Sequence, residues 1–135
     1  MMDYNNSQSA ITPCQLGKIH RNFHKLGSVQ RNITVPICER EGPPIIIKDE
    51  QEWKGARDLT RSLIIKKGGV RKVYCRISLP HNGDIIVEPG GELHLIGAHL
   101  HNGCGKPWKG IVVQEKGKNK GVVFYSNEVI IEDAQ

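Results

Sequence analysis

The sequence is long enough for one domain and carries only a small excess of positive charge. It has 135 residues, and single domains typically contain about 100–150. It contains no run of about 18 apolar residues, so we exclude a transmembrane helix, and its first thirty residues lack the succession of basic, apolar and small residues of a secretory signal. Lys and Arg outnumber Asp and Glu by 19 to 14. This excess is far below that of a dedicated nucleic-acid-binding protein.

The first thirty residues predict one amphipathic helix. Thr12, Pro13 and Gln15 are typical of a helix N-cap, the first helical position and a capping box. Gly27 is suited to the end of such a helix. Apolar residues recur between them at spacings of three or four, namely Leu16, Ile19, Phe23 and Leu26. Because an isolated helix of about fourteen residues is only marginally stable, we expect its apolar stripe to pack against a larger body.

The remainder of the chain predicts a mainly β fold. Five short aliphatic clusters begin 18, 22, 26 and 18 residues apart, and a charged or amide residue follows each one. They are Ile45–Ile47, Leu63–Ile65, Ile85–Val87, Ile111–Val113 and Val129–Ile131. A recurrence of about twenty residues is typical of stacked solenoid coils. Residues 31–135 are therefore predicted to form the start of a right-handed parallel β-helix or solenoid, with a β-sandwich as the alternative.

The four cysteines leave the redox state open. Cys14, Cys38, Cys75 and Cys104 form no CxxC motif, which excludes a zinc ribbon and a thioredoxin-like site. An even number of cysteines in a small β-rich chain is compatible with two disulfides, in any of three pairings. Buried free thiols are the alternative in a reducing compartment.

The histidines provide no metal site that the sequence alone supports. His20 and His24 are four residues apart on the predicted helix, but the glutamate of an HExxH motif is absent between them. His99 and His101 share one face of a predicted strand and can chelate a metal weakly, although a solvated strand face explains them equally well. We therefore predict no metal ligand in this chain.

Two features are candidate binding elements. Between Asp58 and Asp84 the chain has six basic residues and no acidic one, which can attract a polyanion but is typical of a solvated strand face. Trp53 and Trp108 are candidate substrate-binding residues that can stack on sugars, or equally structural residues. No GxSxG, phosphate-loop or paired-carboxylate motif is present, so no complete active site can be assembled.

The beginning of the chain resembles the end of a known peptidase domain. The segment MDYNNSQSAITPCQLGKIHRNFH, at residues 2–24, contains Met2 and Tyr4 in a pattern like a Met-turn, followed by a helix with a Thr-Pro-x-Gln opening. This arrangement is similar to the C-terminal part of the metzincin-type, pappalysin-like zinc metallopeptidases of Bacteroidetes. The resemblance implies that Met2 forms an apolar floor beneath the zinc ligands and that Tyr4 lies near the metal.

The β-rich part carries a second resemblance. Residues 75–113, CRISLPHNGDIIVEPGGELHLIGAHLHNGCGKPWKGIVV, resemble the region that follows such peptidase domains and also stand-alone surface proteins with β-helical repeats. The zinc-binding HExxHxxGxxH helix is absent. The resemblance therefore implies a non-catalytic C-terminal fragment of a secreted zinc metallopeptidase, in which residues 1–30 are a remnant of the peptidase domain and residues 31–135 an accessory region.

These resemblances lead to a set of functional expectations. Catalysis and zinc would belong to the parent metalloendopeptidase, and this chain alone would bind no cofactor. Its partners would be the remainder of the peptidase domain and a polysaccharide, and it would not bind nucleic acid. The protein would be secreted or located on the cell surface. The alternative function is a self-standing adhesion or carbohydrate-binding β-helix module that uses Trp53 and Trp108. The substrate, the disulfide pairing, the true start and the oligomeric state stay open.

Overall fold

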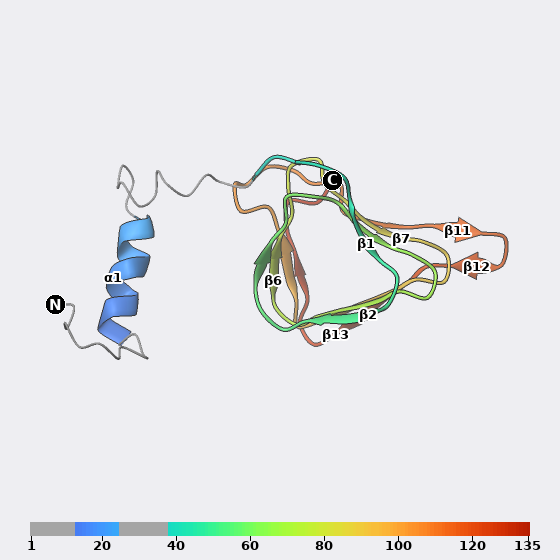
Figure 1. The fold of residues 1–135 in the computed structure, drawn as a ribbon, viewed down its shortest axis with the longest axis horizontal. Coiled ribbons are helices and arrows are strands. Elements are labelled where there is room, and N and C mark those ends of the chain that lie inside the picture. The colour runs from blue at the N-terminus through green and yellow to red at the C-terminus, as the bar shows by residue number, and fades with distance from the viewer. Residues whose placement is uncertain (1–12, 25–37) are drawn as a thin grey trace. The chain divides into compact units, whose positions relative to one another are not determined.

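The computed structural model describes residues 13–24 and 38–135. They belong to two units, residues 1–35 and 36–135, which are described separately (Figure 1). The predicted boundary between residues 30 and 31 lies outside the described residues. The interpretation of the first unit as a peptidase remnant therefore stays a prediction.

The first unit contains the helix α1 (Pro13–His24), at the place where the sequence predicts it. Three residues of the predicted apolar stripe are described, and Leu16, Ile19 and Phe23 are 48%, 41% and 41% exposed. Thr12, Leu26 and Gly27 lie outside the described residues. The packing partner expected for this stripe stays a prediction.

The second unit is a β-solenoid in which the chain passes repeatedly through three parallel sheets (Figure 1). The first sheet contains β1 (Ile45–Ile47), β4 (Leu63–Ile65), β7 (Ile85–Val87) and β10 (Ile111–Val113). The second contains β2 (Glu50–Trp53), β5 (Val70–Val73), β8 (Glu92–Ile96) and β13 (Val122–Ser126). The third contains β3 (Arg57–Asp58), β6 (Arg76–Ser78), β9 (His99–His101) and β14 (Ile130–Ile131).

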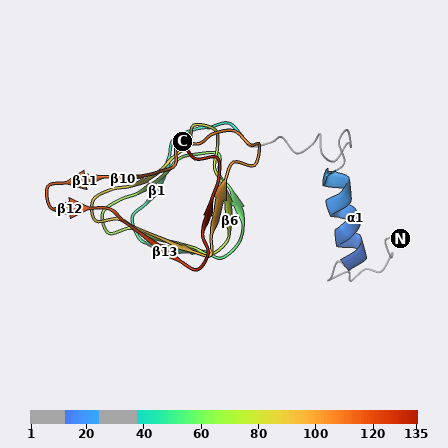
Figure 2. The same ribbon diagram turned by 180° about the vertical axis from the view of Figure 1, so that it is seen from behind.

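All pairings within these three sheets are parallel, and the solenoid has about three turns. The prediction of a parallel β-solenoid is therefore confirmed, and the alternative of a β-sandwich is wrong. An antiparallel hairpin of β11 (Glu115–Lys116) and β12 (Asn119–Lys120) is inserted between β10 and β13. It projects from one corner of the triangular coil, as Figure 2 shows from behind.

Two details of the predicted strands need correction. The first four aliphatic clusters stack in the first sheet, but the fifth does not, because β14 pairs with β9 in the third sheet. The inserted hairpin lengthens the last coil and shifts this cluster to a different side. The alternating segment from Lys72 to Leu79 is likewise not one strand, because a corner at Tyr74–Cys75 separates β5 from β6.

The core consists of columns of aligned side chains inside the coil. Equivalent residues of successive coils stack directly on one another, as Ile47, Ile65 and Val87 do in the first sheet. These three side chains are at most 2% exposed. Leu93 and Leu100 fill the second and third sides in the same coil and are fully buried. Burial of apolar columns is therefore the main source of stability, at about 25 cal/mol per Å² of apolar surface.

Glycine is required where the chain turns from the first sheet to the second. Gly69, Gly91 and Gly121 occupy this corner in successive coils, and a Cβ atom there would lie only 2.6, 2.6 and 2.4 Å from a backbone oxygen of the preceding coil. A side chain at these positions would force the coils apart. This contact explains the glycines that follow several aliphatic clusters in the sequence.

One disulfide joins the entry to the solenoid with a loop of the third coil. Cys38 is bonded to Cys104, 66 residues later, whereas Cys14 and Cys75 are free thiols. Glu39 forms an ion pair with Lys106 beside this disulfide. The structure thus selects one pairing that the sequence left open, and it shows one disulfide where two were compatible with the sequence.

Candidate functional site

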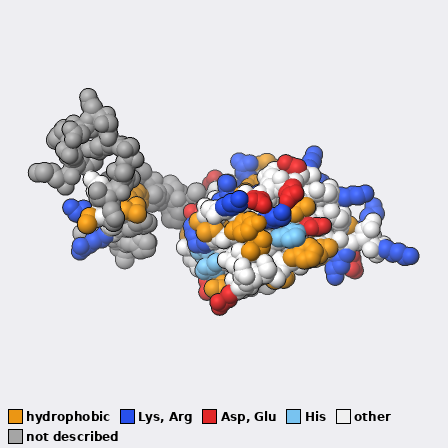
Figure 3. Space-filling model, turned by 90° about the horizontal axis from the view of Figure 1, so that it is seen from below, with side chains coloured by type: hydrophobic (Ala, Val, Ile, Leu, Met, Phe, Trp, Pro, Cys, Tyr) orange, Lys and Arg blue, Asp and Glu red, His pale blue; other side chains and the backbone are white. Residues whose placement is uncertain are grey.

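The outer side of the second sheet carries acidic, basic and aromatic side chains that are exposed or half-exposed. Side chains of a strand alternate between its two faces, so the residues between the buried ones point outward. We call this surface the polar-aromatic face, and Figure 3 views the solenoid from this side. Its members are Glu50, Glu52, Val70, Lys72, Glu92, His94, Ile96, Val122, Phe124 and Ser126, with Tyr74 at the corner after β5.

One end of the polar-aromatic face is charged. Lys72 forms an ion pair with Glu50, and its Nζ lies 3.8 Å from a carboxylate oxygen of Glu52. The hydrogen bond between Lys72 and Glu50 lowers the pKa of the glutamate and raises the pKa of the lysine. Lys54 also contacts Glu52, at 3.1 Å. This end therefore offers carboxylate acceptors and ammonium donors that are held on neighbouring coils.

The other end of the face is aromatic. The rings of His94 and Phe124 stack with their centroids 4.4 Å apart and an angle of 24° between their planes. His94 Nε2 lies 3.0 Å from a carboxylate oxygen of Glu92, which orients the imidazole. Phe124 is 46% exposed. An exposed ring that is held by a stacked neighbour provides flat apolar surface at low entropic cost, flanked here by hydrogen-bonding groups.

The two tryptophans predicted to contact a sugar lie in the core. Trp108 is 0% exposed and donates its indole N–H to the backbone oxygen of Glu132 at 2.7 Å. Trp53 is 8% exposed and lies against the guanidinium of Arg71, 4.0 Å from the ring centroid. Both tryptophans therefore have packing roles in the solenoid, and their predicted contact with a sugar, which needs an exposed ring face, stays a prediction.

The outer side of the third sheet carries a chain of ionisable residues that runs from β3 through β6 and β9 to Glu132, directly after β14. Arg76 donates to Asp58 at 2.9 Å and lies 3.0 Å from His101 Nε2. His101 stacks on His99 at 4.8 Å between centroids, and His99 Nε2 lies 2.9 Å from Glu132. Burial lowers the pKa of His101, and the charges of His99 and Arg76 lower it further. A neutral His101 can accept the hydrogen bond of Arg76, so the chain ties the coils together.

The same contacts bear on metal binding by the two histidines. The Nε2 atoms of His99 and His101 already contact Glu132 and Arg76, and the arginine would repel a cation. Within residues 13–24 and 38–135, no group of three or more His, Cys, Asp or Glu residues is placed to hold a metal ion.

The basic stretch of the sequence does not form one surface. Lys66 and Lys67 lie at the corner after the first sheet, and Lys72 and Arg76 project from the second and third sheets. Arg71 points into the core and is 1% exposed. A continuous basic segment in the sequence is therefore distributed over different sides of the coil.

Several predicted residues lie where the structure provides no test. Met2 and Tyr4 of the Met-turn resemblance fall outside the described residues, and the side chains of His20 and His24 are not described either. No helix in the described part of the chain is long and apolar enough to cross a membrane.

The first sheet presents an outer surface of a different kind. Its outward column is purely aliphatic, with Ile46 and Val112 exposed at its two ends by 47% and 41% and Ile64 and Ile86 half-buried between them. It lacks hydrogen-bonding side chains, which makes it a suitable reference surface for mutagenesis of the polar-aromatic face.

Sequence reasoning missed the residues of the polar-aromatic face. Phe124 lies in the alternating segment Val122–Ser126, which is a recognisable strand signal. Its neighbour His94 is 30 residues earlier, so only the strand register shows that the two rings stack. Strand alternation could have identified each residue as outward-facing, but not their proximity.

Comparison of the chain with family models, curated proteins and solved structures finds no match. The resemblance to metzincin peptidases consequently depends on the short motifs alone. The arguments about function that follow depend on the solenoid and its surfaces.

Proposed function

We propose that residues 36–135 form a non-catalytic polysaccharide-binding module that uses the polar-aromatic face. The observation that carries this proposal is the stack of His94 and Phe124, which fixes an exposed ring beside charged side chains on a parallel sheet. Sugar rings have apolar C–H faces and polar hydroxyl edges. A fixed aromatic ring complements the first, and carboxylates and ammonium groups complement the second.

The arrangement assigns a contact to each kind of group. A sugar ring packs on Phe124, while the carboxylates of Glu92 and Glu52 accept hydrogen bonds from its hydroxyl groups and Lys72 donates to a hydroxyl oxygen. Successive coils are about 4.8 Å apart, so the charged and aromatic ends lie within reach of one short oligosaccharide. Binding of this type needs neither a metal nor a nucleophile.

The disulfide is consistent with a secreted or cell-surface location, where such a module would encounter polysaccharides. A disulfide such as Cys38–Cys104 is typical of proteins in oxidising compartments, including secreted and cell-surface proteins. The module can act alone as an adhesion protein or as the accessory region of the larger secreted peptidase that the sequence resemblance implies. The peptidase connection is a hypothesis based on residues 1–30.

The test is binding of the purified chain to a panel of immobilised glycans. We expect specific retention that Phe124→Ala weakens roughly three- to tenfold, the effect of one aromatic contact. The matched control is Ile46→Ala on the first sheet, since Ile46 is 47% exposed and Phe124 46%. The control should leave binding unchanged. Failure to retain any glycan, or equal effects of the two substitutions, would refute the proposal.

A further inference from the structure

A corner of the solenoid gathers lysines from distant parts of the sequence. Lys48 follows β1, and Lys66 and Lys67 follow β4, so they leave the first sheet at the same corner of successive coils. The hairpin of β11 and β12 is inserted at this corner in the last coil and adds three more. We call this set the lysine ridge; its members are Lys48, Lys66, Lys67, Lys116, Lys118 and Lys120.

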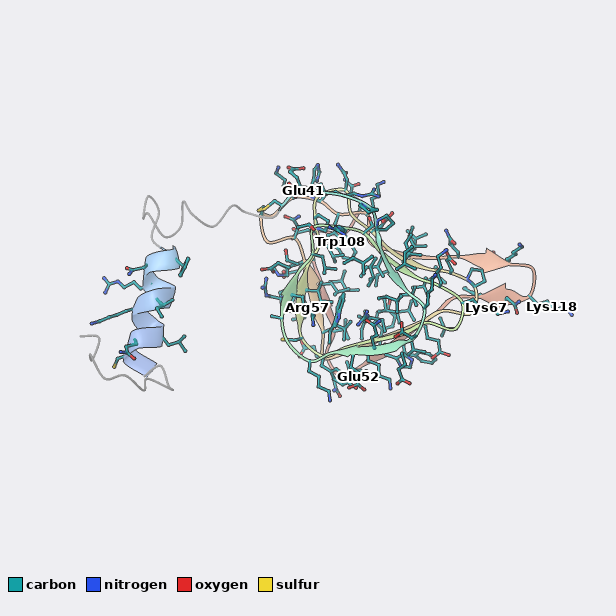
Figure 4. All side chains as sticks on the ribbon, viewed as in Figure 1. Glu41, Glu52, Arg57, Lys67, Trp108 and Lys118 are labelled. Carbon is teal, nitrogen blue, oxygen red and sulfur yellow. A yellow bond between two sulfur atoms is a disulfide. The ribbon has the colours of Figure 1, made fainter. Side chains whose placement is uncertain are left out.

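Backbone contacts make the ridge continuous. The N–H of Gly68 donates to Gly90 O at 2.8 Å, and the N–H of Gly90 donates to Lys120 O at 3.2 Å. A Cβ atom at Gly90 would lie 3.0 Å from Cγ of Lys67, so this glycine leaves room for the lysine side chain. The third coil therefore bridges the lysines of the second coil and the hairpin. Figure 4 shows Lys67 and Lys118 at this same corner.

The ridge has a net positive charge of about three, because three acidic residues at the same corner offset half of its six lysines. These acidic residues are Asp49, Glu88 and Glu115. Of the six ridge lysines, all of which the structure describes, Lys66 alone forms an ion pair, with Glu88 at 3.4 Å. All six side chains are exposed or half-exposed. Coils about 4.8 Å apart lie within the Debye length of about 8 Å at physiological salt, so neighbouring lysines attract an anion jointly.

We infer that the ligand of the module is an acidic polysaccharide, whose carboxylate or sulfate groups contact the lysine ridge while its sugar rings contact the polar-aromatic face. This inference rests on the proposed function and specifies its ligand class. The two surfaces are adjacent, because β2 begins at Glu50, two residues after Lys48, and β5 begins at Val70, three residues after Lys67. One polymer chain can therefore contact both.

The side chains of the ridge favour a polysaccharide over a nucleic acid. The corner segments that carry the ridge, residues 48–49, 66–69, 88–91 and 114–121, contain no arginine, which is the residue suited to bidentate phosphate recognition. These segments also contain no aromatic side chain on which a base could stack. Lysines act as point charges and suit the dispersed carboxylates or sulfates of a glycan.

The experiment measures affinity for four immobilised polymers with the full chain. Heparin carries sulfates, polygalacturonate carries carboxylates, dextran is neutral, and duplex DNA represents the other polyanion class. The test variant is the triple substitution Lys116→Ser, Lys118→Ser and Lys120→Ser in the exposed hairpin. The control is Arg40→Ser, Arg61→Ser and Lys109→Ser, which removes the same charge from exposed positions outside the ridge. Thermal unfolding checks that both variants fold.

We expect the wild type to bind heparin or polygalacturonate more tightly than dextran and DNA, with affinity falling as salt rises. The hairpin variant should bind the acidic polymer about tenfold more weakly, whereas the control should change little. Equal losses in both variants, or tighter binding of DNA, would overturn the inference. If the hairpin variant binds normally while Phe124→Ala does not, the inference about the lysine ridge is refuted and the proposed polysaccharide-binding function is retained. If no glycan is retained, both proposals are refuted.

Discussion

Arg71 is a buried cation in the core of the solenoid, and its replacement by an apolar residue should stabilise the fold. The side chain is 1% exposed and occupies the same inward column as Leu93. Among the described residues, its Nε and Nη1 atoms have no hydrogen-bond partner. Nη2 donates to Gln51 Oε1 at 2.6 Å. Burying a charge with incomplete partners is costly.

The size of this cost follows from the pKa of the guanidinium. Burial, followed by repulsion from Arg57, lowers the pKa of Arg71 from its ordinary value to about 10. At about 1.4 kcal/mol per pKa unit, the charged form is about 3 kcal/mol less stable in the folded chain. The contact with Trp53 and the bond to Gln51 offset about 2 kcal/mol. Arg71→Met should therefore raise the free energy of unfolding by about 1 kcal/mol.

Chemical denaturation provides the assay, with Arg76→Met as the control. Arg76 is a half-exposed arginine whose ion pair with Asp58 and hydrogen bond with His101 are each worth about 0–1.5 kcal/mol, so its replacement should destabilise the fold by about 1–2 kcal/mol and not stabilise it. Gln51→Ala should destabilise the protein by about 1–2 kcal/mol, because it leaves Nη2 without its acceptor. If Arg71→Met destabilises the fold by more than about 2 kcal/mol, the contacts of the guanidinium outweigh the cost of burying its charge, and the reasoning is wrong.

Three further predictions concern stability. Replacing Cys38 and Cys104 by serine should lower the free energy of unfolding by about 4 kcal/mol, the chain-entropy value for a 66-residue separation; an unchanged melting temperature would contradict this. Gly91→Ala should cost at least about 2 kcal/mol, whereas Gly55→Ala, with no atom within 4 Å, should be neutral; equal denaturation midpoints would show that the corner can relax. Because the pKa of His101 is lowered by folding, the unfolded chain binds more protons below pH 6.5 and stability should fall as pH falls. His101→Gln should reduce that fall between pH 8 and 5.5, and an identical pH dependence would exclude this role.

The solenoid could be predicted from the sequence because its inner columns require repetition. Ile47, Ile65 and Val87 stack directly, so each coil places a similar aliphatic residue at the same position. The corner glycines recur for an equally physical reason, the close approach of consecutive backbones. The triplet Trp-Lys-Gly occurs at residues 53–55 and 108–110, but its two copies are not equivalent, because Trp53 lies in the second sheet and Trp108 at a corner. Similar triplets do not ensure equivalent positions when a loop or hairpin changes the coil length.

The surfaces were harder to predict, because outward positions are not constrained by stacking. The column of Glu52, Lys72, His94 and Phe124 changes from acid to base to aromatic without altering the coil beneath it. Each residue is unremarkable in its own strand, and the site exists only through the register that aligns four strands. The lysine ridge depends in the same way on a hairpin inserted at one corner. A solenoid therefore separates the residues that specify its fold from those that bind a ligand, and substitutions on the polar-aromatic face should change binding with little effect on stability.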